Sequence, residues 1–358
     1  MPDRSSRSRT GDHDLDELLA AILDRAGATA NRDLLLDILA DSVRLAGEDV
    51  ERLDLKIMSA ALNEMAEAFR VFAPYRDRPK VTMFGSARTL PDDPLYAQAR
   101  ELAEAMARSG WMVVTGAGPG IMAAGLEGAG RDMAFGINIR LPHEQGANEF
   151  IDNDPKLVEM KYFFTRKLML MKESDAFVVL PGGFGTLDES FELLTLLQTG
   201  KAVPAPLVFL EVPGGTFWQS WTSFLRHEVE PRGLISSEDH HLWMVTDDVG
   251  EAAGEVLGFY RNYHSIRWVG RTLVIRMRRG PDDQELAALN ATFGELCLKG
   301  GIQRAEPFPA EVAGQDHLEL DRIALRFDYV HYGRLRQLID VLNTYPANTS
   351  SPDSPQSR

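Results

Sequence analysis

A glycine-rich stretch decides the fold of this chain: residues 181–189 read PGGFGTLDE. The stretch follows a short apolar run over residues 176–180 and opens a helical pattern over residues 190–198. Glycines let backbone N–H groups approach a ligand closely, and a helix start adds unpaired amides and the positive end of its dipole. The stretch therefore predicts an anion-binding cradle. The alternative is an ordinary exit from a strand, because many α/β proteins use a glycine turn for that alone.

Composition sets the first bounds on function. The 358 residues, 44% hydrophobic and 25% charged, fit one main domain with one or two smaller additions. The chain has 53 acidic and 38 basic residues, a formal charge of −15, which argues against a nucleic-acid or anionic-membrane partner but leaves room for a local anion pocket. Cys297 is the only cysteine, so an intramolecular disulfide and a cysteine-based metal cluster are excluded.

Localisation is expected to be cytoplasmic. The single cysteine fits a reducing compartment. Residues 1–11 are polar and arginine-rich without the apolar segment of a signal peptide, and no apolar run reaches the length of a membrane span. We therefore expect no membrane partner.

The distribution of apolar and polar residues predicts five parts. Residues 1–12 and 346–358 are rich in small, polar and proline residues and are predicted to be disordered tails. Residues 13–78 carry apolar side chains at three- and four-residue steps, which predicts an N-terminal helical extension. Residues 79–263 alternate between strand and helix patterns, and residues 264–345 read as a small C-terminal α/β unit.

The central part is predicted to be a Rossmann-like, doubly wound parallel sheet. Its strand candidates are apolar on both faces and alternate with helices, which is typical of a parallel sheet covered on both sides. These candidates are residues 81–84, 112–115, 134–139, 176–180, 207–210 and 242–245. Ligands bind such sheets beyond the carboxyl ends of the strands. Three of those ends carry glycine turns, which we expect to form one pocket that includes Gly85, Ser86, Gly116, Gly118, Gly120, Gly182, Gly183, Gly185 and Thr186.

A helix predicted over residues 160–173 places two cations among apolar side chains. Lys167 can lay its stem on apolar surface and reach water with its ammonium group. Arg166 has apolar neighbours on both sides, so we expect a carboxylate or phosphate partner for it, because an unpaired buried charge is costly.

Glu189 has two interpretations. With Thr186 it forms a capping-box pattern, in which both side chains satisfy free amides at a helix start. On the other hand, Asp188 and Glu189 would repel a bound phosphate unless they point away or are paired, and Arg166 could pair with Glu189. An Arg–Glu pair beside an anion cradle is a candidate acid/base site.

Together these motifs resemble the signature of the LONELY GUY (LOG) family of nucleoside 5′-monophosphate phosphoribohydrolases. The resemblance rests on the pair Arg166-Lys167, on SDAF at residues 174–177, and on PGGFGT at residues 181–186 followed by Glu189. It extends over the predicted Rossmann-like part and leaves out the helical extension and the C-terminal unit.

The resemblance implies cleavage of the N-glycosidic bond of AMP or an N6-modified AMP, a cytokinin precursor, to free base and ribose 5-phosphate. By the family motif, Arg166 and Glu189 are the catalytic pair. Such cleavage develops positive charge on the ribose, so a carboxylate can stabilise it and deprotonate the attacking water. The nucleotide contacts that the resemblance implies are Gly183, Gly185, Thr186, Lys167, Thr195 and Glu144.

Other classes of protein fit less well. A dinucleotide-dependent oxidoreductase is disfavoured because Ile121 stands where the third glycine of its fingerprint belongs and no acidic residue ends the next strand at Arg140. No lysine stands out as the Schiff base of a pyridoxal-phosphate decarboxylase. No cofactor and no metal are expected, since His240 and His241 are adjacent and without a third ligand. The open alternative is a non-catalytic nucleotide or molybdenum-cofactor carrier of the same fold.

Self-association is expected from the helical extension. One face of its helices is too apolar to stand in water, and LOG relatives are at least dimers, so we expect a homodimer or higher homo-oligomer that buries part of residues 14–72. No catalytic constellation stands out in the C-terminal unit. Its predicted strands and helices are residues 271–277, 282–298, 318–327 and 332–343.

Overall fold

A computed structural model describes residues 9–140 and 146–345 of the chain. They fall into two compact units, Met1–Asn63 and Glu64–Arg358, each of which is described by itself. The predictions that lie wholly or partly outside the described residues are the tails at residues 1–12 and 346–358 and the contact Glu144.

The first unit is helical. It contains α1 (His13–Arg25), α2 (Arg32–Ala46) and the beginning of α3 (Arg52–Phe72). The Asp12 side chain caps α1 by accepting hydrogen bonds from backbone amides of its first turn. Large apolar side chains remain exposed along these helices: Leu15, Leu18, Ile22, Leu34, Leu35, Ile38, Leu53, Leu55, Met58 and Leu62. An exposed apolar face of this kind is typical of a surface that binds another protein. Self-association through these helices stays a prediction.

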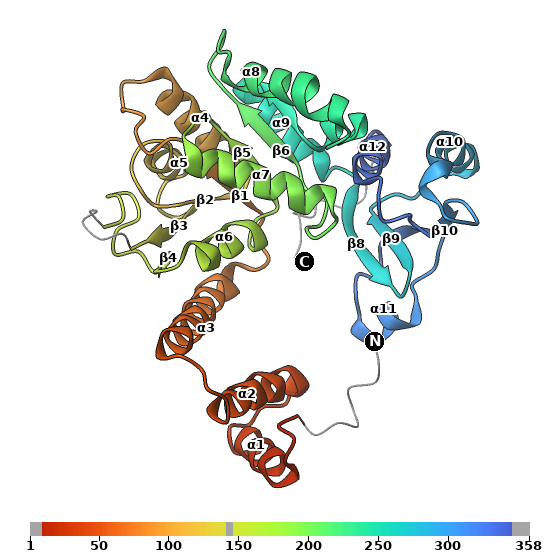
Figure 1. The fold of residues 1–358 in the computed structure, drawn as a ribbon. Coiled ribbons are helices and arrows are strands. Elements are labelled where there is room, and N and C mark those ends of the chain that lie inside the picture. The colour runs from red at the N-terminus through yellow and green to blue at the C-terminus, as the bar shows by residue number, and fades with distance from the viewer. Residues whose placement is uncertain (1–8, 141–145, 346–358) are drawn as a thin grey trace. The chain divides into compact units, whose positions relative to one another are not determined.

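The second unit is built on a seven-stranded, fully parallel sheet in the order β4-β3-β2-β1-β5-β6-β7, which is the predicted doubly wound architecture (Figure 1). Its strands are β1 (Lys80–Phe84), β2 (Met112–Thr115), β3 (Ala134–Ile139), β4 (Leu157–Met160), β5 (Ala176–Val179), β6 (Leu207–Leu210) and β7 (Met244–Thr246). The edge strand β4 was not predicted, because we assigned its last residue to the following helix. The last strand begins two residues later than predicted, since a 3-10 turn occupies Ser237–Leu242.

Helices cover both faces of this sheet with separate apolar cores. One face packs α4 (Pro94–Arg108), α5 (Ile121–Ala129) and α9 (Val249–Phe259) against side chains such as Val81 and Val178. The opposite face packs the end of α3 with three helices against side chains that include Phe84. These three helices are α6 (Phe163–Lys172), α7 (Phe184–Gln198) and α8 (Phe217–Phe224). Burial on both faces explains the unbroken apolar strands that the sequence shows.

A second, antiparallel sheet follows in the order β10-β11-β9-β8. Its elements are β8 (Tyr263–Val269), β9 (Thr272–Met277), α10 (Asp283–Phe293), β10 (Gln303–Arg304), α11 (Pro309–Gly314), β11 (Asp321–Leu325) and α12 (Tyr332–Leu342). The strands β8 and β10 and the helix α11 were not predicted. Arg276 on β9 and Glu311 on α11, both buried, form an ion pair of 2.7 Å that holds the short helix against the sheet. Short non-α turns complete the described chain at Ala73–Tyr75, Leu225–Val229, Glu230–Arg232 and Gly294–Leu296.

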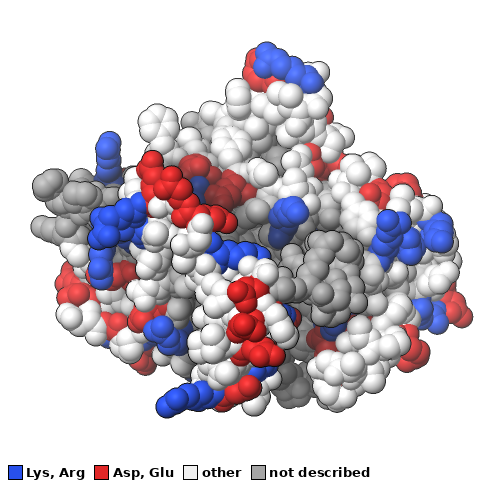
Figure 2. Space-filling view, turned by 60° about the horizontal axis from the view of Figure 1, so that its bottom comes forward, with Lys and Arg blue, Asp and Glu red and all other residues white. Residues whose placement is uncertain are grey.

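The charged surface is mixed. On the face drawn in Figure 2, acidic and basic side chains alternate with uncharged ones, and the described residues form no continuous basic area there. None of the described helices is both long and apolar enough to cross a membrane.

Candidate active site

Three glycine turns meet at the carboxyl edge of the parallel sheet. β1 lies between β2 and β5 in the sheet. The order in which successive strands are added reverses at this point, so the loops that follow these three strands converge. Ser86 N donates to Pro181 O at 3.2 Å, and Ile121 N donates to Ser86 O at 3.0 Å. The loop after β1 thus touches both the loop after β5 and the start of α5, as expected for one shared site.

Two of the glycines are required by this close approach. An ideal Cβ on Gly182 would stand 2.2 Å from Thr186 Oγ1 and 3.0 Å from Ser86 N. One on Gly120 would stand 2.3 Å from Ser86 O, and the φ of +67° at Gly120 is a conformation that other residues rarely adopt. Glycine is therefore needed at these two positions for the loops to pack against each other, whether or not a ligand binds.

Gly183 and Gly185 have a different environment. A Cβ at either position would meet nothing within 4 Å, and both residues are exposed. Gly183 is the N-cap of α7, which begins at Phe184 rather than at the predicted residue 190. The first turn of this 15-residue helix thus carries two exposed glycines with no neighbouring atom at their Cβ positions, and the unpaired amides of a helix start are groups that can bind an anion.

The capping-box interpretation is wrong. Gly183 occupies the cap position without a side-chain hydrogen bond, so Thr186 and Glu189 both lie inside α7. Thr186 is buried against Gly182, while Glu189 is partly buried one turn further along the helix. The Glu189 carboxylate does not cap the helix, so it is available for another role.

Arg166 on α6 is buried, with 9% of its surface exposed, and is held by backbone carbonyls. Its Nε donates to Ile137 O at 2.9 Å, and its Nη2 donates to Gly116 O at 3.2 Å. A Cβ at Gly116 would stand 1.9 Å from Nη2, so only glycine leaves room for the guanidinium. The carbonyl of Ile137 in β3 and that of Gly116 just after β2 satisfy these donors without cancelling the charge, and among the described residues no carboxylate forms an ion pair with Arg166.

Glu189 and Arg166 interact by the electrostatic attraction of their charges. Among the described residues neither a hydrogen bond nor an ion pair joins them, so the expected direct pair is not formed. Burial raises the pKa of Glu189 to about 7, against the opposing effects of Arg166 and then Lys167. A carboxyl group that titrates near neutral pH can hold or release a proton during catalysis.

Lys167 forms ion pairs with two carboxylates on α7. Its Nζ lies 2.6 Å from Asp188 Oδ2 and 2.6 Å from Glu192 Oε2. Burial lowers the pKa of Lys167, but the hydrogen bonds to Asp188 and Glu192 outweigh it and leave the pKa raised. The lysine therefore links α6 to α7 and neutralises Asp188 beside the loop, instead of standing free for a phosphate.

The remaining predicted contacts divide between the loops and the far end of α7. Thr195 lies nine residues beyond Thr186, about 13 Å along the helix, and its Oγ1 donates to Phe191 O, so it is not brought to the loops. Gly118 does lie in the site, and its carbonyl accepts from Asn148 Nδ2 at 2.8 Å. Asn148 N also donates to Ala117 O at 2.9 Å. We did not predict this loop-pinning role, although an asparagine in a loop between strands is a signal for it.

The histidines and tryptophans have structural partners. His240 pairs with Glu230 at 2.9 Å, and within the described residues no group of three metal-ligating side chains comes together. Trp218 and Trp221 pack beside Phe209 in the core under α8.

The fold and these loops define an α/β protein with a cluster of glycine turns at its switch point, and similarity to known proteins names the family. A family model described as possible lysine decarboxylase matches residues 117–256. A cytokinin riboside 5′-monophosphate phosphoribohydrolase of Mycobacterium tuberculosis is 35% identical over 167 residues, which cover 44% of this chain and 86% of that relative. The chain belongs to the LOG family, as its motifs predicted.

Two further similarities carry less weight. A cytokinin riboside 5′-monophosphate phosphoribohydrolase of Arabidopsis thaliana is 42% identical over 77 residues, 22% of this chain, so the chain spans about a third (34%) of that relative's length. The molybdenum cofactor carrier protein of Chlamydomonas reinhardtii aligns with a TM-score of 0.36 and 21% identity over 50% of this chain and 96% of that one. A likeness at that level carries no argument about function.

The raised pKa of Glu189 predicts a pH-dependent change in stability. The pKa of about 7 lies above the 4.5 of an ordinary glutamate, so the folded protein binds more protons than the unfolded chain between these values and loses stability as pH rises through this window. Glu189→Gln removes that loss. We expect the variant to be about 1–3 kcal/mol more stable than the wild type near pH 8 and equally stable near pH 4.

Urea unfolding at both pH values measures this difference. The matched control is Glu104→Gln, which changes an exposed glutamate on α4 that pairs with Arg108. A Glu189→Gln protein that is less stable than the wild type at pH 8 contradicts the assignment.

Proposed function

We propose that this protein hydrolyses the N-glycosidic bond of a purine nucleoside 5′-monophosphate to free base and ribose 5-phosphate. The observation that carries the proposal is Glu189, a partly buried carboxyl group with a pKa of about 7, placed one turn after the open amides at the start of α7. An acid/base group and an anion cradle on one helix suit a substrate with a phosphate at one end and a reacting centre nearby.

The phosphate is assigned to the amides around Gly183 and Gly185. No atom lies within 4 Å of the Cβ positions of these two exposed glycines, and the amides stand at the positive end of the α7 dipole. Thr186 is packed against Gly182, so it shapes the loop that presents the amides. The ion pair of Lys167 with Asp188 reduces the repulsion that this carboxylate would exert on a phosphate.

Glu189 is assigned the proton transfer. In its ionised form it accepts a proton from water as the oxygen attacks C1′ of the ribose, and its charge stabilises the positive charge that develops there. The bond from C1′ to the base nitrogen breaks, and the electron pair leaves with the base. The proton on Glu189 then passes to the base, which balances the reaction as nucleotide plus water giving base plus ribose 5-phosphate.

Arg166 is assigned a positioning role. Its charge favours the ionised form of Glu189, so it moves the pKa of that group down toward neutrality against the effect of burial. The carbonyls of Ile137 and Gly116 fix the guanidinium, so this electrostatic effect is present before substrate binds.

AMP and N6-modified AMP are the proposed substrates. The relatives from Mycobacterium tuberculosis and Arabidopsis thaliana are named for cytokinin riboside 5′-monophosphates, which are adenine nucleotides modified at N6. Membership of the LOG family supports extending this substrate class to the present chain.

The first test of the proposal is the requirement for phosphate. We expect AMP to release adenine, and adenosine to react at least 100-fold more slowly in kcat/KM, because it lacks the group that the α7 amides bind. Chromatographic detection of adenine measures both rates. Equal kcat/KM values for AMP and adenosine contradict the phosphate assignment, and no adenine from any purine nucleoside monophosphate indicates a binding protein.

A second test concerns the carboxylate itself. We expect Glu189→Gln to lower kcat for AMP by about 10²–10⁴-fold, the usual range for loss of a general base. Arg166→Ala should give a loss of similar size, and the double variant should fall little further because the two residues act as a unit. Steady-state kinetics on folded variants, with Glu104→Gln as the control, measures these changes. A fully active Glu189→Gln protein refutes the mechanism.

A further inference from the structure

The side of the candidate active site that is formed by α6 and α7 has no excess of positive charge. Its cations are Arg166 and Lys167, and its carboxyl groups are those of Asp188, Glu189 and Glu192. Lys167 forms ion pairs with two of these carboxylates, and Arg166 is buried and donates to backbone carbonyls. Both cations are therefore already bonded within the protein.

The start of α7 does not by itself balance the charge of a phosphate. A helix start acts as roughly half a positive charge, whereas a phosphate monoester carries about −1.5 to −2 near pH 7. The amides assigned to the phosphate, around Gly183 and Gly185, also lie within one helical turn of Asp188. A nucleotide phosphate at this place therefore needs a cation from another element.

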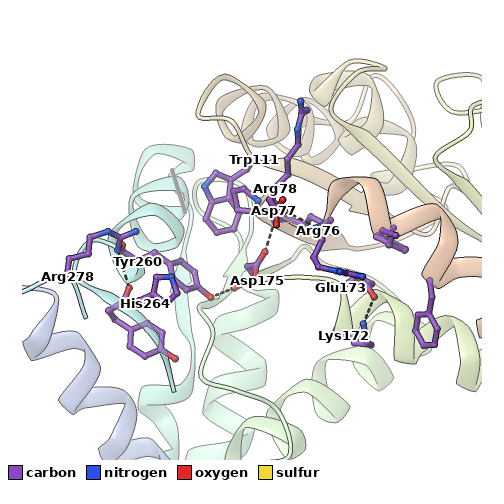
Figure 3. A pocket seen from close by; sticks show the side chains of 16 residues that line it. Arg76, Asp77, Arg78, Trp111, Lys172, Glu173, Asp175, Tyr260, His264 and Arg278 are labelled. Carbon is purple, nitrogen blue, oxygen red and sulfur yellow. Dashed lines mark hydrogen bonds and ion pairs between the residues drawn. The ribbon is translucent and has the colours of Figure 1, made fainter. Parts of the chain in front are cut away.

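The cations at the amino edge of the parallel sheet are too far away to supply it. Figure 3 shows a pocket at that edge, which is lined by Arg76 and Arg78 before β1 and by Asp175 before β5. The five residues of β1 separate this edge from the carboxyl edge by roughly 15 Å. The cation must therefore come from a loop at the carboxyl edge.

Arg88 follows β1 on a loop that contacts the glycine turn before α7. In this loop Ser86 N donates to Pro181 O at 3.2 Å, and the backbone of Ala87 lies against Gly120, where a Cβ would stand 2.9 Å from Ala87 Cα. Arg88 N donates to Ser86 Oγ at 3.0 Å, which fixes the turn between the two residues. Two residues span at most about 7 Å, so the Cα of Arg88 lies within that distance of Ser86.

The guanidinium of Arg88 has no partner of its own within the described parts of the chain. The residue is exposed, and its side chain forms neither a hydrogen bond nor an ion pair there. A guanidinium presents its donors as a fork that matches two phosphate oxygens. Lys161, another exposed cation, follows the edge strand β4, and its Nζ lies 5.2 Å from the ring centre of Tyr162. Of these two cations, Arg88 is the one whose loop is bonded to the glycine turn before α7.

We propose that Arg88 binds the 5′-phosphate of the nucleotide together with the amides of α7, and so makes the protein specific for a phosphorylated substrate. This inference rests on the proposed function, because it assigns a residue to the phosphate of that substrate. The role of Arg88 is to bind substrate, and proton transfer remains with Glu189. Loss of its side chain therefore acts on KM rather than on kcat.

Steady-state kinetics of Arg88→Ala test the assignment. We expect KM for AMP to rise by about 10–100-fold, the range for loss of a hydrogen bond to a charged group, with kcat nearly unchanged. The kcat/KM for adenosine should not change, because adenosine has no phosphate. Arg88→Lys should recover part of the loss, since it keeps the charge without the fork. The matched control Lys161→Ala should behave as the wild type.

Binding of ribose 5-phosphate, followed by calorimetry, separates this assignment from the proposed reaction. We expect Arg88→Ala to weaken binding by about 10–100-fold and Lys161→Ala to leave it unchanged. If this result is found and AMP releases no adenine, the assignment of Arg88 stands and the proposed hydrolysis fails. If an Arg88→Ala protein that is folded by circular dichroism hydrolyses AMP with the KM of the wild type, the hydrolysis stands and the assignment of Arg88 is overturned. An equal loss in Lys161→Ala also overturns it, because the effect then comes from charge in general.

Discussion

The site depends on one buried guanidinium. Arg166 reaches from α6 to β3 and to the turn after β2, where the carbonyls of Ile137 and Gly116 accept its hydrogen bonds. Gly116 permits this, because any side chain there would occupy the space of Nη2. A buried charge held by neutral carbonyls remains a full charge in a poorly solvated place, so its field acts strongly on neighbouring groups.

The electrostatic field of Arg166 acts on Glu189. Its burial on α7 would by itself keep the carboxyl group protonated, and the cations opposite bring its pKa to about 7. The Lys167 ion pairs with Asp188 and Glu192 tie α6 to α7, so the helix that carries the cations and the helix that carries the carboxyl group are joined. The same helix α7 presents open amides at its start. Binding of an anion and transfer of a proton are therefore proposed for neighbouring turns of one element.

The sequence predicted the features that local chemistry determines. Strands buried on both faces leave unbroken apolar runs, and turns that must approach one another closely need glycine, so the sheet and the convergence at Gly182 and Gly120 could be predicted. The partners of Arg166 could not, because backbone carbonyls leave no side-chain signal. The start of α7 was placed late, since the glycines that favour a turn also permit a helix cap.

The pKa of Glu189 is the quantity on which the account rests, and a titration of its side-chain carboxyl measures it directly. Carbon-13 NMR of glutamate-labelled protein, with Glu189→Gln to assign the signal, gives the midpoint as a function of pH. The account predicts a midpoint near pH 7, because burial raises the pKa to about 7 against the opposing charge of Arg166. A midpoint near 4.5, the value of an ordinary glutamate, would contradict it.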